Sequence, residues 1–145
     1  MLRDVNLTEL LAAIGERTPA PASGAATALT AAVAAALAEL AARYAGNEED
    51  AELAHALATE LVRLGDDDAA AFSAFMANPN EETRAEIMRI PEEIARLADE
   101  AVVIALRATD KLSPSVAGDA YAAAELGRAA AAVAPGLAEL NRAGS

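Results

Sequence analysis

The sequence contains no cysteine and no tryptophan, and only two phenylalanines and two tyrosines among its 145 residues. The absence of cysteine excludes disulfide bonds, zinc ribbons and thiol catalysis. Apolar residues make up 54% of the chain, and alanine alone supplies roughly 30%. Alanine buries little apolar area, and burial stabilises a fold by about 25 cal/mol per Å². A single copy therefore has a thin core, and we expect a homodimer or larger assembly whose folding depends on association.

Positive charge is also scarce. Eleven basic residues face 23 acidic ones, which gives a net charge of −12 and an isoelectric point near 4.4. The arginines are scattered along the chain and never cluster. Nucleic acids and anionic membrane surfaces both require a basic patch, so we expect neither as a partner. Arg17 and Arg128 are candidates for offsetting the negative field near an anionic ligand.

Residues 18–38 carry no charge and are long enough to cross a bilayer. The stretch opens with Pro19 and Pro21, however, and its only large apolar residues are Leu29, Val33 and Leu37. Because alanine is nearly neutral for membrane insertion, the stretch is predicted to be a buried core helix. The first four residues do not resemble a signal peptide, since an acidic residue interrupts the basic region. We therefore expect a cytoplasmic protein.

No segment alternates with a period of two, so strands are not expected. The length fits one domain, residues 1–145. The apolar spacing predicts an all-α, up-and-down bundle of about five long helices, dimeric, with helices at 7–14, 24–44, 48–77, 81–111 and 116–140. Pro91 and Pro135 are expected to bend or restart the last two.

Helix ends are marked by capping residues. Asn6 with Glu9 predicts a capping box, Ser23 and Asn47 are expected to cap the second and third helices, and Gly46 ends the second. The large apolar residues of the second helix recur at spacings of four and three and form one stripe: Leu29, Val33, Leu37, Leu40 and Tyr44.

His55 is the only histidine, and with Glu52 it forms Glu-x-x-His. Di-iron bundles use two such motifs and two further glutamates, which one chain cannot supply. The sequence therefore favours a surface or interface histidine and no metal. A di-metal site shared across a dimer stays a distant alternative.

Three aspartates follow one another at 66–68. Successive helical positions turn by about 100°, so the three carboxylates cannot chelate one ion. Asp66 and Asp67 are expected to be solvated. Asp68 lies four residues before Phe72, beside the apolar face, where half-burial would raise its pKa and suit it to acid or base work. A structural cap or hydrogen-bonding role is the alternative.

Two further segments could contribute to a site. Asp119 follows the Ser113–Gly118 turn and lies near the start of the last helix, where a first-turn acid is also stabilised by the helix dipole. Residues 21–24, with Pro21, Ser23 and Gly24, lead into the second helix. The backbone N–H groups at such a start can hold a carboxylate or phosphate.

In order, these segments resemble the cyclodeaminase/cyclohydrolase family, which includes the cyclodeaminase domain of formiminotransferase-cyclodeaminase and methenyltetrahydrofolate cyclohydrolases. The family's Thr-Pro-x-Pro, triple glycine and serine compare with TPAPASGAA at 18–26, and its Asp-x-x-Ala-Phe with DAAAF at 68–72. A proline with an Ile/Leu/Ala face compares with 91–98, and its Ser-Asp-Ala-Gly with GDAY at 118–121, followed by an alanine-rich helix. The resemblance covers nearly the whole chain.

The resemblance implies a homodimeric bundle that binds a reduced folate as substrate and needs no metal or other cofactor. The reaction would be loss of ammonia from 5-formiminotetrahydrofolate, or hydrolysis of 5,10-methenyltetrahydrofolate. Asp68 and Asp119 would do acid–base work or anchor the pterin. The loop with Pro21, Ser23 and Gly24, together with Ser115, would approach the ligand.

The chain also departs from the family pattern. Ala22 and Ser23 replace two of the three glycines, and Ala25 replaces the serine after them. Tyr121 replaces a glycine, and the family's late asparagine has no counterpart before Asn141. These changes add Cβ atoms or remove polar partners where a folate would lie. The second hypothesis is therefore a non-catalytic relative that binds another small molecule or a protein in the same cleft.

Overall fold

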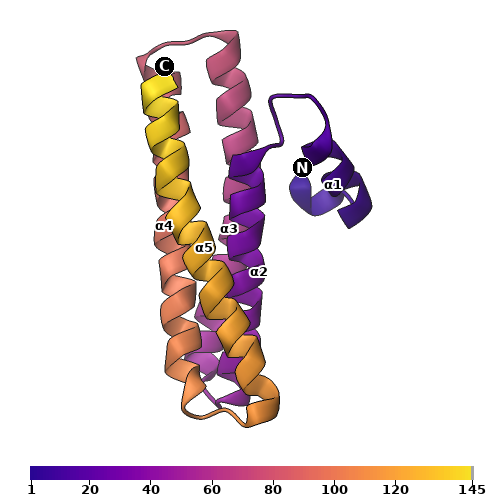
Figure 1. Ribbon diagram of the computed structural model, residues 1–145, viewed down its shortest axis with the longest axis vertical. Coiled ribbons are helices and arrows are strands. Elements are labelled where there is room, and N and C mark those ends of the chain that lie inside the picture. Colours follow the sequence, from indigo (N-terminus) through magenta and orange to yellow (C-terminus); the bar gives the residue numbers. More distant parts are fainter. Residues whose placement is uncertain (145) are drawn as a thin grey trace.

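The computed structural model describes residues 1–144, and in that range it contains helices and no strands (Figure 1). The prediction of an all-α protein is confirmed. A 3-10 turn, η1 (Leu2–Asp4), precedes five α-helices: α1 (Leu7–Gly15), α2 (Ser23–Tyr44), α3 (Glu48–Ala77), α4 (Glu81–Thr109) and α5 (Pro114–Gly144). The helices α2 to α5 run up and down in one bundle, whereas α1 is short and stands beside it (Figure 1). All five predicted helices are present; four of them are long, and α1 has 9 residues.

The capping residues set most helix ends as predicted. Asn6 and Glu9 form the capping box of α1, and the Asn47 side chain accepts a hydrogen bond from the Asp50 N–H at 3.0 Å. Gly46 ends α2 with a φ of 75°, in the left-handed region that glycine tolerates. Ser23 is not a cap, because it is the first residue of α2 and no side chain caps that helix.

The core of the bundle is lined by alanine on α2 and by larger residues on its neighbours. The buried positions of α2 are almost all alanine, and the largest fully buried side chains lie on α3 and α4: Leu61, Leu64, Ile90, Pro91, Ile94 and Ile104. Small side chains let helix axes approach closely, and α2 packs against α3, α4 and α5. The prediction of a core helix in this segment is confirmed.

Most large apolar residues of α2 lie away from the core, although Leu37 also packs against it. Val33, Leu40 and Tyr44 are 53%, 38% and 65% exposed, and Leu29 and Leu37 are half-buried. We call these five residues the outward stripe. The most hydrophobic face of α2 is thus largely exposed to solvent in a single copy. The helices pack so closely at the centre of the bundle that only the alanine face of α2 fits there.

By length and composition α2 could span a membrane, and 56% of its most apolar window is buried inside the bundle. Its alanine face packs against three other helices. This packing agrees with a core helix.

Pro91 lies inside α4 without ending it, since the helix continues from Glu81 to Thr109. Proline has no N–H, so the carbonyl four residues earlier, that of Ile87, lacks its helical donor. The Asn141 side chain on α5 supplies one, with its Nδ2 donating to the Ile87 carbonyl oxygen at 2.7 Å. This hydrogen bond joins α4 and α5 at the end of the bundle where α2 begins.

Candidate functional site

Asp68 on α3 lies directly against the first turn of α2. Gly24 has no side chain, and a Cβ built there would overlap the carboxylate of Asp68. Any other residue at position 24 would therefore displace this carboxyl group or the start of α2. The family has three glycines in this loop, and this chain retains only Gly24. Gly24 is the position at which a side chain would collide with Asp68.

A small cavity of about 90 Å³ opens beside this contact. Its lining includes the first residues of α2, and beyond the start of α2 the bundle continues as α3, α4 and α5 (Figure 1). Its lining comes from the loop before α2 and from four helices: Pro19, Ala20, Ala22, Ser23, Gly24, Asp68, Phe72, Ile87, Leu137 and Asn141. We call it the Asp68 cavity. It is mainly apolar, with a few polar groups, as small-molecule sites are.

Burial raises the pKa of the Asp68 carboxyl above its ordinary value of 3.8. Within residues 1–144, no hydrogen bond or ion pair to this carboxyl offsets the loss of solvent. The prediction of a half-buried Asp68 with a raised pKa is confirmed. Such a group can both donate and accept a proton closer to neutral pH than a solvated aspartate can.

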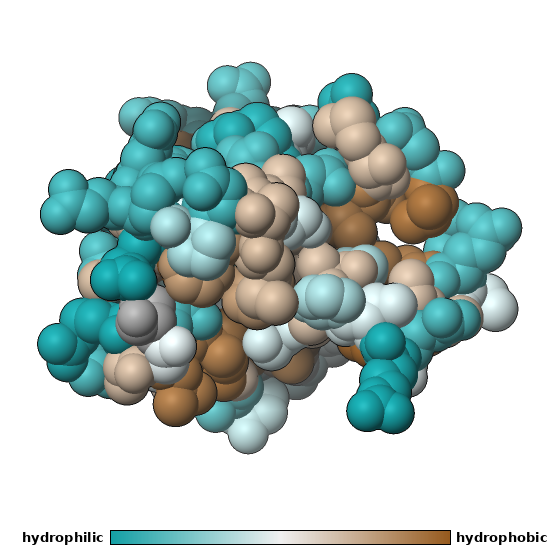
Figure 2. Space-filling model, turned by 90° about the horizontal axis from the view of Figure 1, so that it is seen from above, coloured by the Kyte–Doolittle hydropathy of each residue, from teal (hydrophilic) through white to brown (hydrophobic). Residues whose placement is uncertain are grey.

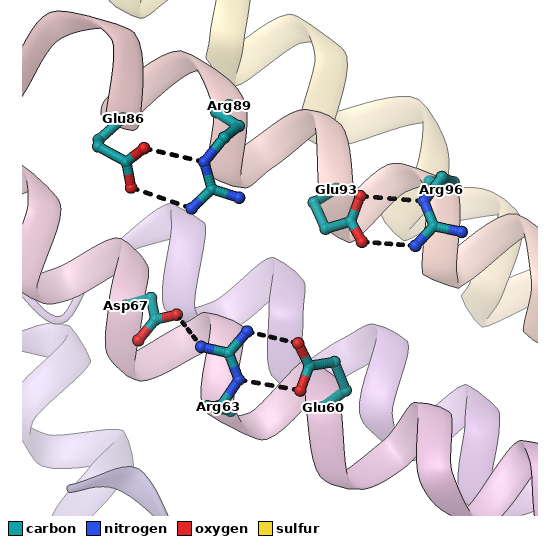
Figure 3. A network of polar contacts seen from close by, with 7 residues as sticks. All are labelled: Glu60, Arg63, Asp67, Glu86, Arg89, Glu93 and Arg96. Atoms are coloured by element: carbon teal, nitrogen blue, oxygen red, sulfur yellow. Dashed lines mark hydrogen bonds and ion pairs between the residues drawn. The ribbon is translucent and has the colours of Figure 1, made fainter. Parts of the chain in front are cut away.

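The two neighbouring aspartates behave differently from each other. Asp67 forms an ion pair with Arg63, on the solvent side of α3 (Figure 3). Asp66 accepts a hydrogen bond from the Leu2 N–H at 2.7 Å, and its Oδ2 is buried without a partner. The expectation of a solvated Asp66 is wrong, because η1 packs on α3.

Asp119 and Ser115 belong to the first turns of α5. These turns lie at the opposite end of the bundle from the start of α2 (Figure 1), where residues of the Asp68 cavity are found. Asp119 comes 22 residues before Asn141 in α5, which at about 1.5 Å per residue places them about 33 Å apart. Ser115 is exposed, and its Oγ lies 2.8 Å from that of Ser113. One copy therefore brings Asp68, Ser23 and Gly24 together, with Pro21 in the same loop, and leaves Asp119 and Ser115 apart from them.

His55 is 69% exposed, and its Nδ1 lies 3.1 Å from the Glu39 carboxylate. It is a surface residue, as the sequence favoured. Among residues 1–144, no three histidine, cysteine, aspartate or glutamate side chains gather as a metal site would require.

Asn141 and Ile87 were not predicted as site residues. The signal that could have found them is Pro91, which leaves the Ile87 carbonyl in need of a donor. Asn141 is the donor that α5 provides.

Most arginines are held by nearby carboxylates. Arg63 pairs with Glu60 and Asp67, Arg89 with Glu86, and Arg96 with Glu93 (Figure 3). Seen along the bundle axis, hydrophilic side chains surround the end of the bundle and apolar groups lie exposed between them (Figure 2). Arg17, in the loop that leads to the Asp68 cavity, is exposed and has no ion pair within the described residues.

A crystal structure of formiminotetrahydrofolate cyclodeaminase from Thermotoga maritima superposes with a TM-score of 0.90, at 22% identity, over 97% of this chain and 80% of that one. At this identity the likeness shows the shared fold. No curated protein sequence matches the chain. The family model described as formiminotransferase-cyclodeaminase matches residues 6–143. Since this match covers nearly the whole chain, the chain belongs to the formiminotransferase-cyclodeaminase family.

Proposed function

We propose that this chain is a folate one-carbon enzyme that acts on 5-formiminotetrahydrofolate as a cyclodeaminase, or on 5,10-methenyltetrahydrofolate as a cyclohydrolase. The observation that carries the proposal is the Asp68 carboxyl, buried against Gly24 with a raised pKa. Family membership supplies the substrate class. The 22% identity to the Thermotoga enzyme does not choose between the two reactions.

The two reactions require opposite proton transfers at Asp68. In the cyclodeaminase reaction, N10 attacks the formimino carbon, the N10 proton passes to the imino nitrogen, and the C–N bond to that nitrogen breaks. Protonated Asp68 would donate a proton to the departing ammonia. In the cyclohydrolase reaction, water adds to the methenyl carbon and ionised Asp68 would take a proton from that water. The carbon–N5 bond then breaks, and Asp68 would return the proton to N5 to give 10-formyltetrahydrofolate. The pKa of Asp68, raised by burial, suits it to either step.

The size of the Asp68 cavity supports a homodimer. Sites that enclose drug-sized ligands measure about 300–1,000 Å³, whereas this cavity measures about 90 Å³. One copy could enclose only the reacting end of a folate. The outward stripe begins within two turns of Ser23, so a second copy seated on it would border the same site. Asp119 can share a ligand with Asp68 only if two copies meet.

Arg17 is the cation that we propose meets the folate's glutamate tail. It is exposed near the cavity and unpaired among the described residues. Arg128, the other candidate, pairs with Glu125 at 2.6 Å and lies 13 residues along α5 from Asn141.

The binding test is the thermal midpoint of the protein with and without saturating 5-formyltetrahydrofolate. A ligand at about 100 times its dissociation constant stabilises the native state by about 2.7 kcal/mol. A clear upward shift is expected. An unchanged midpoint at high ligand concentration would contradict the folate assignment.

The altered loop favours a second candidate, a non-catalytic relative that binds another small molecule or a protein partner. Its motivation is the replacement of glycines and serine by Ala22, Ser23 and Ala25. The triple change Ala22→Gly, Ser23→Gly and Ala25→Ser rebuilds the family's loop. Folate binding that appears only in this variant would support the second candidate, and wild-type turnover would exclude it.

A further inference from the structure

The orientation of the Asn141 side chain is fixed by its neighbour on α4. A backbone carbonyl can only accept a hydrogen bond, so the group that faces the Ile87 oxygen at 2.7 Å must be the amide NH₂ of Asn141. The ambiguity between amide nitrogen and oxygen that usually attends asparagine is thereby removed. The amide oxygen, Oδ1, points away from Ile87.

This oxygen has no donor of its own. Within residues 1–144, no hydrogen bond reaches Asn141 Oδ1, and the only buried side-chain atom without a partner is Asp66 Oδ2. Asn141 lines the Asp68 cavity, so its oxygen is an accessible acceptor at the wall of that cavity.

The need for this arrangement comes from Pro91. With any other residue at position 91, the backbone N–H would satisfy the Ile87 carbonyl and Asn141 would be free to rotate. Pro91 is fully buried and does not line the cavity. Its most direct route to the cavity is through the Ile87 carbonyl and the Asn141 amide.

We propose that Asn141 is a ligand-binding residue whose oxygen accepts a hydrogen bond from an N–H group of the ligand held beside Asp68, with Pro91 as a positioning residue. The inference rests on the proposed function, since the pterin ring of a reduced folate carries such N–H groups. It adds a direction to the site: an N–H edge of the ligand faces α5 while the reacting group faces α3. Ligands that present only oxygens on that edge would be rejected.

The test compares the dissociation constant of 5-formyltetrahydrofolate, by isothermal calorimetry, in the wild type and three variants. Asn141→Leu leaves the ligand N–H unpaired and should weaken binding about 10- to 100-fold. Pro91→Ala gives the Ile87 carbonyl a backbone donor and frees the Asn141 amide, so it should weaken binding several-fold. The thermal midpoint should change little, because the better helix propensity of alanine offsets the loss of buried ring atoms. Leu140→Ala, a neighbouring exposed position outside the cavity, is the control and should bind normally.

Pro91→Ala separates ligand binding by Asn141 from a purely structural role. If Asn141 only stabilises the fold, the helix that regains its own hydrogen bond should bind the ligand as tightly as the wild type does. Unchanged affinity in Pro91→Ala and Asn141→Leu alongside normal wild-type binding would overturn this inference alone. If the wild type itself does not bind, the proposed function fails and the inference fails with it. Should Asn141→Leu not fold, the result with Pro91→Ala decides.

A pH profile gives a second readout. Asn141→Asp places another carboxylate in the Asp68 cavity, and a like charge nearby raises the pKa of an acid further. The midpoint of the Asp68-dependent activity should therefore move to higher pH in Asn141→Asp and stay in place in Leu140→Ala. An unmoved midpoint in Asn141→Asp would contradict the placement of this side chain toward Asp68.

Discussion

Asp68 is a residue that the fold holds in an unfavourable environment. Burial raises its pKa above 3.8, so the folded state binds its proton more tightly than the unfolded state does. As pH rises from about 3.8 through the raised pKa, Asp68 ionises first in the unfolded state, and the free energy of unfolding therefore falls. Groups of this kind are typical of functional sites, where a fold retains a strained residue for its chemistry.

The matching prediction uses Asp68→Asn, which removes the titration with little change of shape. We expect the variant to have a higher thermal midpoint than the wild type at pH 7, and the difference to shrink toward about pH 3, below the ordinary aspartate pKa of 3.8, where Asp68 is protonated in both states. Thermal unfolding of both proteins between about pH 3 and pH 8 measures this. A wild type that is more stable than the variant at pH 7 would show that the carboxylate has a compensating partner.

The direction of the pH dependence of turnover distinguishes the two proposed reactions. If Asp68 donates a proton to departing ammonia, kcat should fall as pH rises through its raised pKa; if it accepts a proton from water, kcat should rise. Rates measured across the same pH range for both substrates decide between acid and base. A profile that is flat through this range would remove Asp68 from the proton transfer.

Gly24 offers a test of the contact that forms the site. Gly24→Ala places a Cβ on the Asp68 carboxylate and should cost about 1–3 kcal/mol of unfolding free energy by overpacking, with loss of folate binding. Gly136→Ala on α5, where a Cβ meets nothing within 4 Å, is the matched control and should be neutral or stabilising by about 0.5–1 kcal/mol. Denaturant unfolding measures both, and equal effects would contradict the close approach.

At the scale of the element, α2 shows what hydrophobic periodicity can and cannot predict. Its ends were predictable from the Pro-rich loop before it and from Gly46, because these residues act locally. The buried face was not, since Leu and Val outrank alanine in hydrophobicity while close helix packing selects the smaller side chain. The outward stripe became visible only once α3, α4 and α5 were in place.

The outward stripe also carries the prediction of a dimer. Val33→Glu puts a charge in its middle, and we expect it to yield a folded monomer because Val33 is 53% exposed in a single copy. Val103→Glu on α4, which is 49% exposed, is the control and should stay dimeric. Sedimentation velocity measures both. A dimeric Val33→Glu protein would place the interface elsewhere.

At the scale of the whole molecule, the site combines parts from distant segments. Asp68 could be predicted from the sequence because its spacing to Phe72 set its half-burial. Asn141 could not be predicted, because its role depends on Pro91, which lies 50 residues earlier in another helix. Asp119 fits the family pattern equally well, yet it lies near the start of α5, at the opposite end of this long helix from Asn141.

The charge of the whole molecule bears on how a folate would arrive. At a net charge of −12, an anionic ligand is repelled at long range, and the ion pairs along α3 and α4 neutralise most arginines locally (Figure 3). On the proposed function, folate binding would therefore depend on short-range contacts within the Asp68 cavity and at Arg17.

The most direct test of the central claim is turnover of 5-formiminotetrahydrofolate and of 5,10-methenyltetrahydrofolate by the wild type and by Asp68→Asn. Near-UV absorbance of the methenyl ring follows both reactions. The account predicts wild-type turnover of one of these substrates, reduced about 10²- to 10⁴-fold in Asp68→Asn although that protein remains folded. Turnover that is equal in the two proteins, or absent from the wild type with both substrates, would contradict the claim that Asp68 is the centre of a folate-processing site.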